Sequence, residues 1–345
     1  MKKLLNTIYV TTQGSSLRKD GENIVIDNEG ATIGRVPFHM LASLVIFGGI
    51  YVSPALMEAC TANGISIVLL DRITGRFQAR IEGPVSGNVL LRRAQYKVSD
   101  APDDIAKSIV MGKISNQRAV LMRALRDYRD NYSVEIRKAL ELTCQKLARS
   151  LSYINHNILD CDTLRGEEGN AARLYFGVFD NLIRIQEKEL RFTGRSRRPP
   201  LDPVNAVLSF LYTLLTHDCR AAAESVGLDP AVGFLHRDRP GRPSLALDLM
   251  EELRPIFADR LALSLLNRKQ LQAKDFIYRD AGAVILTDEG RKTVLNAWQE
   301  RKKEERRHPF LEENASFGLV PYLQAQLLSR HLRGDLDAYP PWLWK

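Results

Sequence analysis

The feature that most constrains the fold is a change of pattern near residue 97 of the 345-residue chain. Before it, short β-branched runs such as ATIGRVPF, SLVIFGG and ISIVLLD end at Gly or Asp, which is typical of strands. Beyond it, apolar residues recur with the helical period of about 3.6. We therefore expect an α+β protein of two domains: a β-rich N-terminal domain at 1–96, a linker at 97–104 (KVSDAPDD), and an all-α domain at 105–345.

Local signals place several elements within this division. Asp20-Gly21 marks the bend of a hairpin, and Ser53-Pro54 begins a short helix that Gly64 ends. In the second domain the apolar period predicts helices over Ile105–Asn131, Ser133–Asp160, Ala171–Arg191, Pro203–Val226, Leu245–Asn267 and Gly290–Arg307. The closing YPPWLWK is expected to expose its tryptophans.

Composition indicates where the protein is located in the cell and what kind of partner it binds. A net charge of +8 and a pI near 9.3 fit a polyanionic partner, or equally a merely basic protein. Four separated cysteines without a CxxC pair argue against a zinc ribbon and a disulfide framework. MKKLLNTIYV is a poor signal peptide, and the most apolar window, 38–52, is too short to span a membrane. We expect a cytoplasmic protein with no membrane contact.

The segment GFLHRDRPGRPSLALDLMEELRP (233–255) carries most of the chemistry-bearing residues. His236 is followed by Arg237, Arg239 and Arg242. A helix expected from Ser244 then puts Asp248 and Glu251 on neighbouring turns of one face. Two interpretations remain open at this point: metal-assisted phosphodiester chemistry, or a metal-free surface for nucleic acid.

Two further segments add acidic and basic groups. In LRGEEGNAARLYF, Gly166 and Gly169 flank Glu167-Glu168 ahead of a helix expected near Asn170. Taken alone, these glutamates are best explained as acidic residues at a helix start. RFTGRSRRPPLDPVNA (191–206) is expected to be an arginine-rich loop stiffened by prolines, either a solvated linker or a phosphate-contacting surface.

These motifs, in this order, resemble the CRISPR-associated adaptation integrase family, the nucleases that insert new spacers into the repeat array. The resemblance covers nearly the whole chain. It includes GNVLLRRAQY (87–96), GKISNQR (112–118), EGNAARLYF (168–176), FTGRSRRPPLDPVNAVLSFLYTLL (192–215) and the 233–255 segment. The YPPWLWK end resembles the type I-C branch.

The resemblance implies a metal-dependent active site. Its catalytic residues would be Glu168 (rather than Glu167), His236, Asp248 and Glu251. Glu168, His236 and Glu251 would be the metal ligands, and Asp248 would orient a ligand or a water. Two carboxylates and an imidazole suit Mg²⁺ or Mn²⁺. Glu252 points about 100° away on the same helix and is a worse candidate.

With DNA as the implied substrate, the charge and placement of the basic residues make them candidates for phosphate contact. Phosphates beside the scissile bond would be held by Arg173, Arg237, Arg239 and Arg242. Backbone contacts along the duplex would come from Arg195, Arg197, Arg198, Lys113 and Arg118. For any one arginine near His236, the alternative is a structural ion pair with Asp238 or Asp248.

The implied function is a DNA endonuclease and integrase of CRISPR adaptation, a part of antiviral defence. It would join prespacer 3′-hydroxyl ends to the repeat array by transesterification. The family works as homodimers joined through the N-terminal domain, which bridge a dimer of a small ferredoxin-like partner into a heterohexamer. The alternatives are a stand-alone nuclease for branched repair intermediates and a non-catalytic DNA-binding scaffold.

Overall fold

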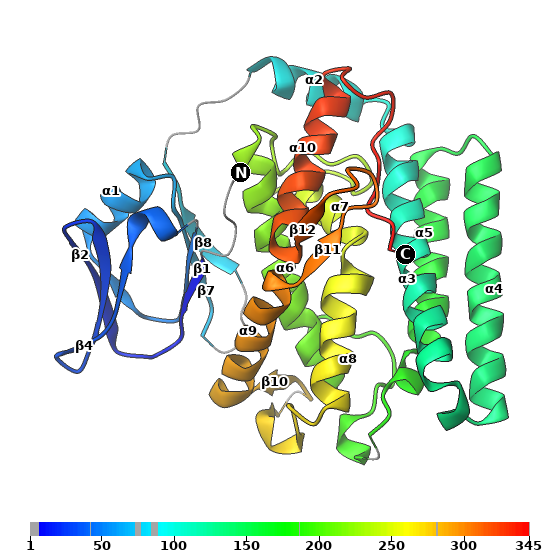
Figure 1. Cartoon of the computed structure of the whole chain (residues 1–345), viewed down its shortest axis with the longest axis horizontal. Helices are drawn as coiled ribbons and strands as arrows, with labels where there is room; N and C mark the ends of the chain where they lie inside the picture. Colours follow the sequence, from blue (N-terminus) through cyan, green and yellow to red (C-terminus); the bar gives the residue numbers. More distant parts are fainter. Residues whose placement is uncertain are drawn as a thin grey trace.

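The computed structural model describes residues 7–41, 43–72, 77–83, 89–185, 187–280 and 282–344. It has a β-rich N-terminal part and a larger helical part, side by side in Figure 1, in agreement with the expected α+β class. Gly87 and Asn88 of the GNVLLRRAQY motif lie outside the described residues. Among the described helices, none combines the length and the apolar character needed to cross a bilayer.

Two four-stranded sheets make up the N-terminal part. The first has the order β1-β5-β7-β8, with parallel pairs except for antiparallel β7 and β8. The second has the order β4-β3-β2-β6 and is antiparallel except for β2 and β6. The bounds are β1 Thr7–Val10, β2 Ser15–Asp20, β3 Asn23–Asn28, β4 Ala31–Pro37, β5 Ser43–Phe47, β6 Tyr51–Val52, β7 Ser66–Leu70 and β8 Phe77–Ile81.

Both local signals in this part are confirmed. The chain turns at Gly21, whose φ of 56° lies in the left-handed region that glycine adopts without strain. Ser53 caps α1 (Pro54–Ala62) by accepting a hydrogen bond from the backbone N–H of Leu56. Pro54 is thus the first helical residue, where its missing N–H leaves no bond unmade.

The sheet β1-β5-β7-β8 is buried on both faces. Leu44, Ile46 and Ile67 point into an apolar cluster shared with the other sheet and with Leu56 of α1. Residues of opposite parity, among them Phe47, belong to the core of the helical part. Because side chains alternate along a strand, one sheet can separate the two cores.

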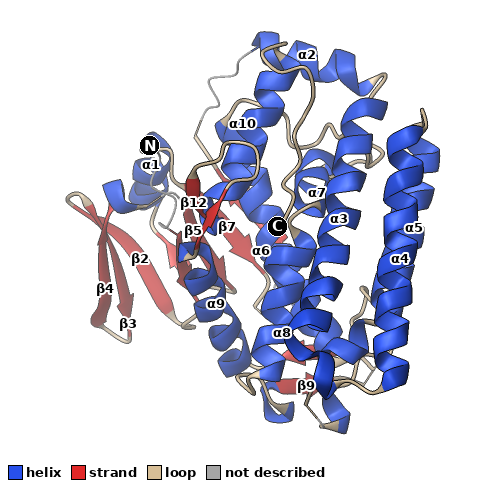
Figure 2. Ribbon diagram, turned by 45° about the vertical axis from the view of Figure 1, so that its right-hand side comes forward, coloured by secondary structure: helices blue, strands red, loops and turns tan. Residues whose placement is uncertain are grey.

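Nine helices form most of the helical part in the described residues (Figure 2). α3, α4 and α5 pack against one another, and α6 runs through the centre with α7, α8 and α10 around it. The bounds are α2 Val89–Ser99, α3 Asp103–Tyr128, α4 Val134–His156, α5 Cys161–Gly177, α6 Pro203–Ser225, α7 Ser244–Glu251, α8 Arg260–Asn267, α9 Asp288–Lys303 and α10 Val320–Leu332.

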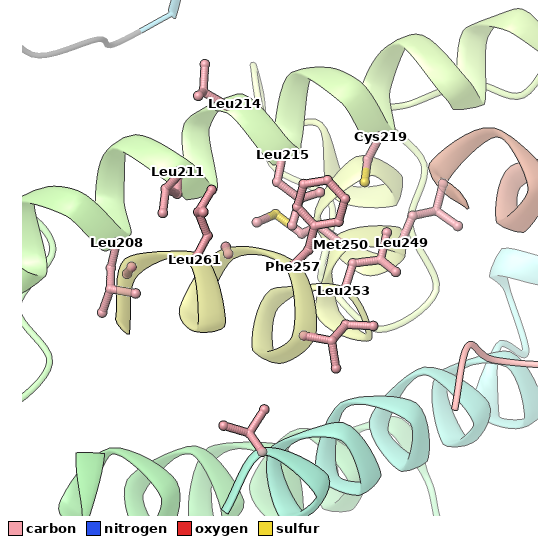
Figure 3. Packing of buried hydrophobic residues seen from close by; sticks show 14 of the residues in the cluster. Leu208, Leu211, Leu214, Leu215, Cys219, Leu249, Met250, Leu253, Phe257 and Leu261 are labelled. Atoms are coloured by element: carbon pink, nitrogen blue, oxygen red, sulfur yellow. The ribbon is translucent and has the colours of Figure 1, made fainter. Parts of the chain in front are cut away.

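Apolar packing around α6 fixes the position of α7. Leu211 of α6 faces Leu261 of α8, and Leu215 of α6 lies beside Phe257, which follows α7 (Figure 3). The segment Arg254–Asp259 is π-helical and continues into α8. Two small hairpins complete the part: β9 Phe276–Tyr278 with β10 Val284–Leu286, and β11 Glu305–Arg307 with β12 Asn314–Ser316.

Two predicted helices have other bounds in the structure, and the segment predicted as a linker contains helix. The predicted linker is mostly helical, because 97–99 end α2 and 103–104 begin α3. Gln95 of α2 donates to the carbonyls of Asp229 and Val232, so this helix is bound to the helical part. The predicted helix over Ala171–Arg191 instead runs from Cys161 to Gly177, and the last one ends at Lys303, before β11. The division into domains stays a prediction.

Candidate active site

Glu168 lies in the interior of α5, not at a helix start. The helix begins earlier than predicted because Asp160 caps it, accepting a hydrogen bond from the backbone N–H of Thr163 at 2.8 Å. Gly166 and Gly169 are poor helix formers, but the packing of α5 on α3 and α4 overrides that local preference. The Glu168 side chain is 25% exposed and faces Lys113 of α3.

Asp248 of α7 organises the loop that carries His236. Its fully buried carboxylate accepts hydrogen bonds from the backbone N–H groups of Phe234 (2.6 Å), Leu235 (3.0 Å) and His236 (3.0 Å). Gly233 permits this close approach, since a Cβ there would lie 2.8 Å from Asp248 Oδ2. The Asp248 carboxylate therefore fixes the backbone of three successive residues of this loop.

The His236 imidazole is held by the same carboxylate. Its Nδ1 lies 2.6 Å from Asp248 Oδ1. A carboxylate at that distance selects the tautomer with the proton on Nδ1, so Nε2 keeps its lone pair. Nε2 lies 3.7 Å from Glu251 Oε1, which places a nitrogen donor and an oxygen donor side by side.

Glu251 is buried and charged. Arg254 Nη1 lies 2.9 Å from its Oε1, and Lys113 Nζ lies 2.6 Å from its Oε2. Burial alone would raise the pKa of this carboxyl, but Arg254, Lys113 and His236 outweigh it and lower the pKa to about 2. The same Lys113 ammonium also contacts Glu168 Oε1, so a single cation joins the two glutamates.

The position of Lys113 corrects its assignment to the DNA-contacting surface. It is 3% exposed, on the face of α3 that packs against α5 and α7. The sequence carried a signal for this: Lys113 shares the buried stripe of α3 with Ile109, Val110 and Gln117, at helical spacing. A lysine there must be paired, and its two carboxylate partners satisfy that need.

The donor set fits a hard divalent cation in its chemistry. Two carboxylates and an imidazole nitrogen are ligand types that Mg²⁺ and Mn²⁺ accept. In the described residues no group of three or more His, Cys, Asp or Glu side chains is arranged as a ready metal cluster. Lys113 accounts for this, because its ammonium lies between Glu168 and Glu251. Glu168, His236 and Glu251 would hold a metal ion, for which the ammonium competes at the two carboxylates.

The remaining predicted arginines divide by exposure. Arg173 donates to Asn170 Oδ1 at 2.8 Å, and Arg237 pairs with Asp162 at 2.6 Å rather than with the expected Asp238 or Asp248. Arg242 is half-buried near the site, and burial, followed by repulsion from Arg239, lowers its pKa. The exposed members are Arg173, Arg197, Arg198, Arg237 and Arg239.

Two of the predicted DNA contacts are already bound within the fold. Arg195 donates to Asn205 Oδ1 at 2.6 Å and lies over the Tyr212 ring at 5.2 Å. Arg118 donates from Nε to the carbonyl of Cys144 at 3.3 Å. Each has internal partners that a phosphate would have to displace or share.

Sequence reasoning missed Arg254 and the network behind the site. Arg254 follows Glu251 at i,i+3, a spacing that could have identified it. Glu252 is fully buried and accepts hydrogen bonds from Tyr339 Oη (2.6 Å), Gln324 Nε2 (2.8 Å) and the backbone N–H of Trp342 (2.6 Å). Burial raises the pKa of Glu252 to about 7.

The C-terminal segment is therefore part of the core, contrary to the expectation of exposed tryptophans. Trp342 is 3% exposed. The Asn116 amide donates to the carbonyls of Glu252 and Trp342, both at 2.7 Å, and its oxygen accepts from the backbone N–H of Trp344. No periodic pattern in YPPWLWK indicates such a contact, because its partners are distant in sequence.

Comparison with known proteins identifies the family. The family described as CRISPR associated protein Cas1 matches residues 8–300. A relative named CRISPR-associated endonuclease Cas1 2, from Rhodospirillum rubrum, is 70% identical over 345 residues and covers 100% of both chains.

Solved structures share the fold. A casposase bound to integration product matches with a TM-score of 0.82 and 22% identity, over 99% of this chain and 94% of that chain. A Cas6-RT-Cas1–Cas2 complex matches with a TM-score of 0.81 and 22% identity, over 100% of this chain and 36% of that chain. At this identity the likeness shows the fold alone. The match over residues 8–300 and the 70% identical relative go further: the chain belongs to the CRISPR-associated protein Cas1 family.

Proposed function

We propose that this chain is a metal-dependent DNA endonuclease and integrase of CRISPR adaptation. The observation that carries the proposal is that the Lys113 ammonium joins Glu168 to Glu251, while His236 Nε2 lies 3.7 Å from the other oxygen of Glu251. The relative named as a Cas1 endonuclease and the casposase bound to integration product support cleavage and strand transfer, respectively. DNA as the substrate agrees with the cytoplasmic location expected from the sequence.

Glu168, His236 and Glu251 would hold the metal ion, Mg²⁺ or Mn²⁺. When bound, a divalent ion supplies Lewis-acid stabilisation of negative charge at phosphoryl oxygens. Asp248 keeps the His236 ring in one orientation and one tautomer, so that Nε2 remains a donor. Arg254 stays beside Glu251 and keeps the carboxyl ionised.

The reaction is a transesterification, in which one P–O bond forms and another breaks. The 3′-oxygen of the incoming strand forms a new bond to the phosphorus of the repeat as the bond to the leaving oxygen breaks. The attacking hydroxyl loses a proton, and the leaving oxygen gains one. The chain's part would be to position the two strands: Arg173, Arg237, Arg239 and Arg242 would hold phosphate oxygens by forked hydrogen bonds.

Binding of the duplex would extend over the exposed arginines Arg197 and Arg198, and it could include Arg195 and Arg118 where they exchange their internal partners for phosphate. We propose that two copies associate through the N-terminal domain, and that a small ferredoxin-like protein joins two such dimers. The similarity to a chain of a Cas6-RT-Cas1–Cas2 complex supports a partner protein. Strong salt dependence of DNA binding is expected from the phosphate contacts.

Single substitutions test the assignment. Glu168→Gln, His236→Ala and Glu251→Gln should each lower joining of a 3′-hydroxyl oligonucleotide into a repeat plasmid at least roughly 100-fold, which is about 3 kcal/mol. Glu167→Gln is the matched control, since Glu167 bonds Ser150 on α4 and not the site. Wild-type rates in all three variants would refute the site and favour a DNA-binding scaffold. Cleavage of branched DNA without joining, even with the partner protein, would favour a repair nuclease.

A further inference from the structure

The C-terminal segment 339–344 packs against the end of the helix that carries Glu251. That helix, α7, has eight residues and ends at Glu251 itself. Glu252 and Leu253 then form a turn ahead of the π-helical Arg254–Asp259. A helix of about two turns is not stable by itself, so contacts with the rest of the fold decide where its last residue lies.

The side chain of Glu252 anchors this helix end. Its carboxylate accepts hydrogen bonds from Tyr339 Oη and from the backbone N–H of Trp342, both at 2.6 Å. Gln324 of α10 donates to the same carboxylate at 2.8 Å, and its own oxygen lies 2.9 Å from His308 Nε2. Two backbone N–H groups donate to His308 Nδ1, so the ring proton is on Nε2 and fixes the orientation of the Gln324 amide. A buried network whose members are all hydrogen-bonded holds its parts rigidly.

Asn116 of α3 holds the backbone of the same residue. Its amide donates to the carbonyls of Glu252 and Trp342, both at 2.7 Å, and its oxygen accepts from the backbone N–H of Trp344 at 2.8 Å. Asn116 follows Lys113 by three residues, so both buried side chains lie on one face of α3. That face therefore contacts the C-terminal segment and the proposed metal site together.

Gly112 of α3 permits this close packing. A Cβ at that position would lie 2.9 Å from Pro341 Cβ and 3.2 Å from Glu252 Cβ. A larger side chain would therefore push the C-terminal segment or the end of α7 away from α3.

The contacts of Glu251 itself are less directional than this anchor. The Lys113 ammonium is a compact point charge, and it competes with a metal ion for the carboxylate. Mg²⁺ demands nearly ideal octahedral geometry, so its protein ligands must be held in place. The groups that anchor Glu252 are not those that pair with Glu251, and the competition at the metal site leaves them in place.

We propose that the C-terminal segment, through Tyr339 and Glu252, positions Glu251 for metal binding. Tyr339 is thus a positioning residue, which acts on the metal site without touching the metal or the DNA. Trp342, the other donor from this segment, lies 90 positions beyond Glu252 in the chain. The inference rests on the proposed function, because it takes Glu251 as a metal ligand.

Titration of the full-length protein with Mn²⁺, followed by calorimetry, tests the proposal. Tyr339→Phe removes one hydroxyl and keeps the ring, and it should weaken Mn²⁺ binding about tenfold, the lower end of the range for residues that orient a metal ligand. Thr143→Val is the control, since it removes one buried hydroxyl from α4. A purely structural role of Tyr339 would lower the melting temperature and leave Mn²⁺ affinity unchanged, and that result would overturn the proposal.

Gly112→Ala is a second variant, which decides the question if Tyr339→Phe does not fold. Alanine favours the helix itself, but its Cβ would displace Pro341 or Glu252, so Mn²⁺ affinity should again fall. Gly177→Ala, at the end of α5, adds a Cβ that meets no atom within 4 Å and should bind Mn²⁺ like the wild type. Equal Mn²⁺ affinity in the two alanine variants would contradict the positioning role.

Hydrogen exchange in the metal-free proteins separates the positioning role from the metal site. The backbone amides of 250–257 should exchange faster in Tyr339→Phe than in the wild type, whereas those of α4 should not change. Glu251→Gln tests the metal ligand itself. If this variant binds Mn²⁺ as tightly as the wild type, the proposed metal site is refuted whatever Tyr339→Phe does. If Glu251→Gln loses Mn²⁺ while Tyr339→Phe keeps both its affinity and its slow exchange, the role of Tyr339 alone is refuted.

Discussion

The cores of the two parts of this chain differ in their chemistry. Between the two N-terminal sheets, an apolar cluster contains Leu17, Leu44 and Ile67, and the buried polar residues of β2 and β7 are the uncharged Ser15 and Ser66. The helical part instead buries charged or titratable groups next to its apolar core, including Lys113, Asp248, Glu251 and Glu252. Buried charge lowers stability unless it is paired, so its concentration around α7 marks the region where function has shaped the core.

The comparison also separates two neighbouring carboxyl groups. Glu251 faces cations, which hold it ionised, whereas Glu252 faces a tyrosine, an amide and a backbone N–H of the C-terminal segment. The first group lies in the proposed metal site, and the second holds the end of α7 against the rest of the core. Adjacent residues of one type therefore have different tasks, because the helix turns them toward different surroundings.

The largest effect on stability is expected from Lys113→Met. Removing a buried cation leaves Glu168 and Glu251 facing each other, which should lower the free energy of unfolding by about 3–5 kcal/mol. Added Mn²⁺ should raise the melting temperature of this variant more than that of the wild type, since an ion can replace the ammonium charge. Lys138→Met, on the exposed face of α4, is the control. Equal Mn²⁺ shifts in all three proteins would contradict the bridging role of Lys113.

Leu44→Ala tests the apolar side of the comparison. Leu44 is fully buried between the N-terminal sheets, so the cavity should cost about 3 kcal/mol of unfolding free energy. Unlike Lys113→Met, this change should leave Mn²⁺ affinity unaltered, which calorimetry on the folded variant measures. A lower Mn²⁺ affinity in Leu44→Ala would mean that the N-terminal core affects the metal site, which the contacts do not indicate.

Asp248→Asn removes one buried charge with little change of shape. An amide nitrogen would face backbone N–H donors or the His236 ring, so the loop and the imidazole would lose their fixed positions. Metal affinity should fall about 10- to 100-fold, as for other residues that orient a ligand. The melting temperature monitors folding, and a variant that folds and binds Mn²⁺ normally would rule out this orienting role.

The smallest effect concerns pH and the junction of the two parts. Burial, then Arg80 of β8 and Arg220, lower the pKa of His217 to about 4. The unfolded state then binds more protons than the folded state between about pH 4 and 6.5, so stability is lost as pH falls through that window. Between pH 6.5 and 5 the contribution of His217 to the free energy of unfolding should fall by about 1.6 kcal/mol. His217→Phe should reduce this loss in denaturant titrations, and His39→Gln, at an exposed position, should not.

The sequence predicted correctly those elements that depend on residues adjacent in the chain. The Asp20-Gly21 bend and the Ser53-Pro54 helix start depend on neighbouring residues and were found as expected. The start of α5 was missed because Gly166 and Gly169 indicate a break, while packing on two other helices keeps the segment helical. Charge alone suggested that Lys113 faces DNA, whereas its place in the apolar stripe of α3 indicated burial.

The candidate site depends even more on contacts between residues that are distant in sequence. Asp248 and Glu251 share a helix face that their spacing predicts. Their convergence with Glu168 depends on how α5, α3 and α7 pack, and only the family resemblance brought Glu168 into the prediction. Arg254 was within reach of the spacing rule. Asn116 and the C-terminal segment were not, because their contacts join residues more than 200 positions apart.

The sheet with a core on each face has a consequence for unfolding. Leu44 and Ile46 belong to one cluster and Val45 and Phe47 to the other, so opening either core would expose one face of β5. Neither part can unfold without removing the support of its neighbour. Heating should therefore give one cooperative transition rather than two, and amide protons of β5 and β7 should exchange only through global unfolding.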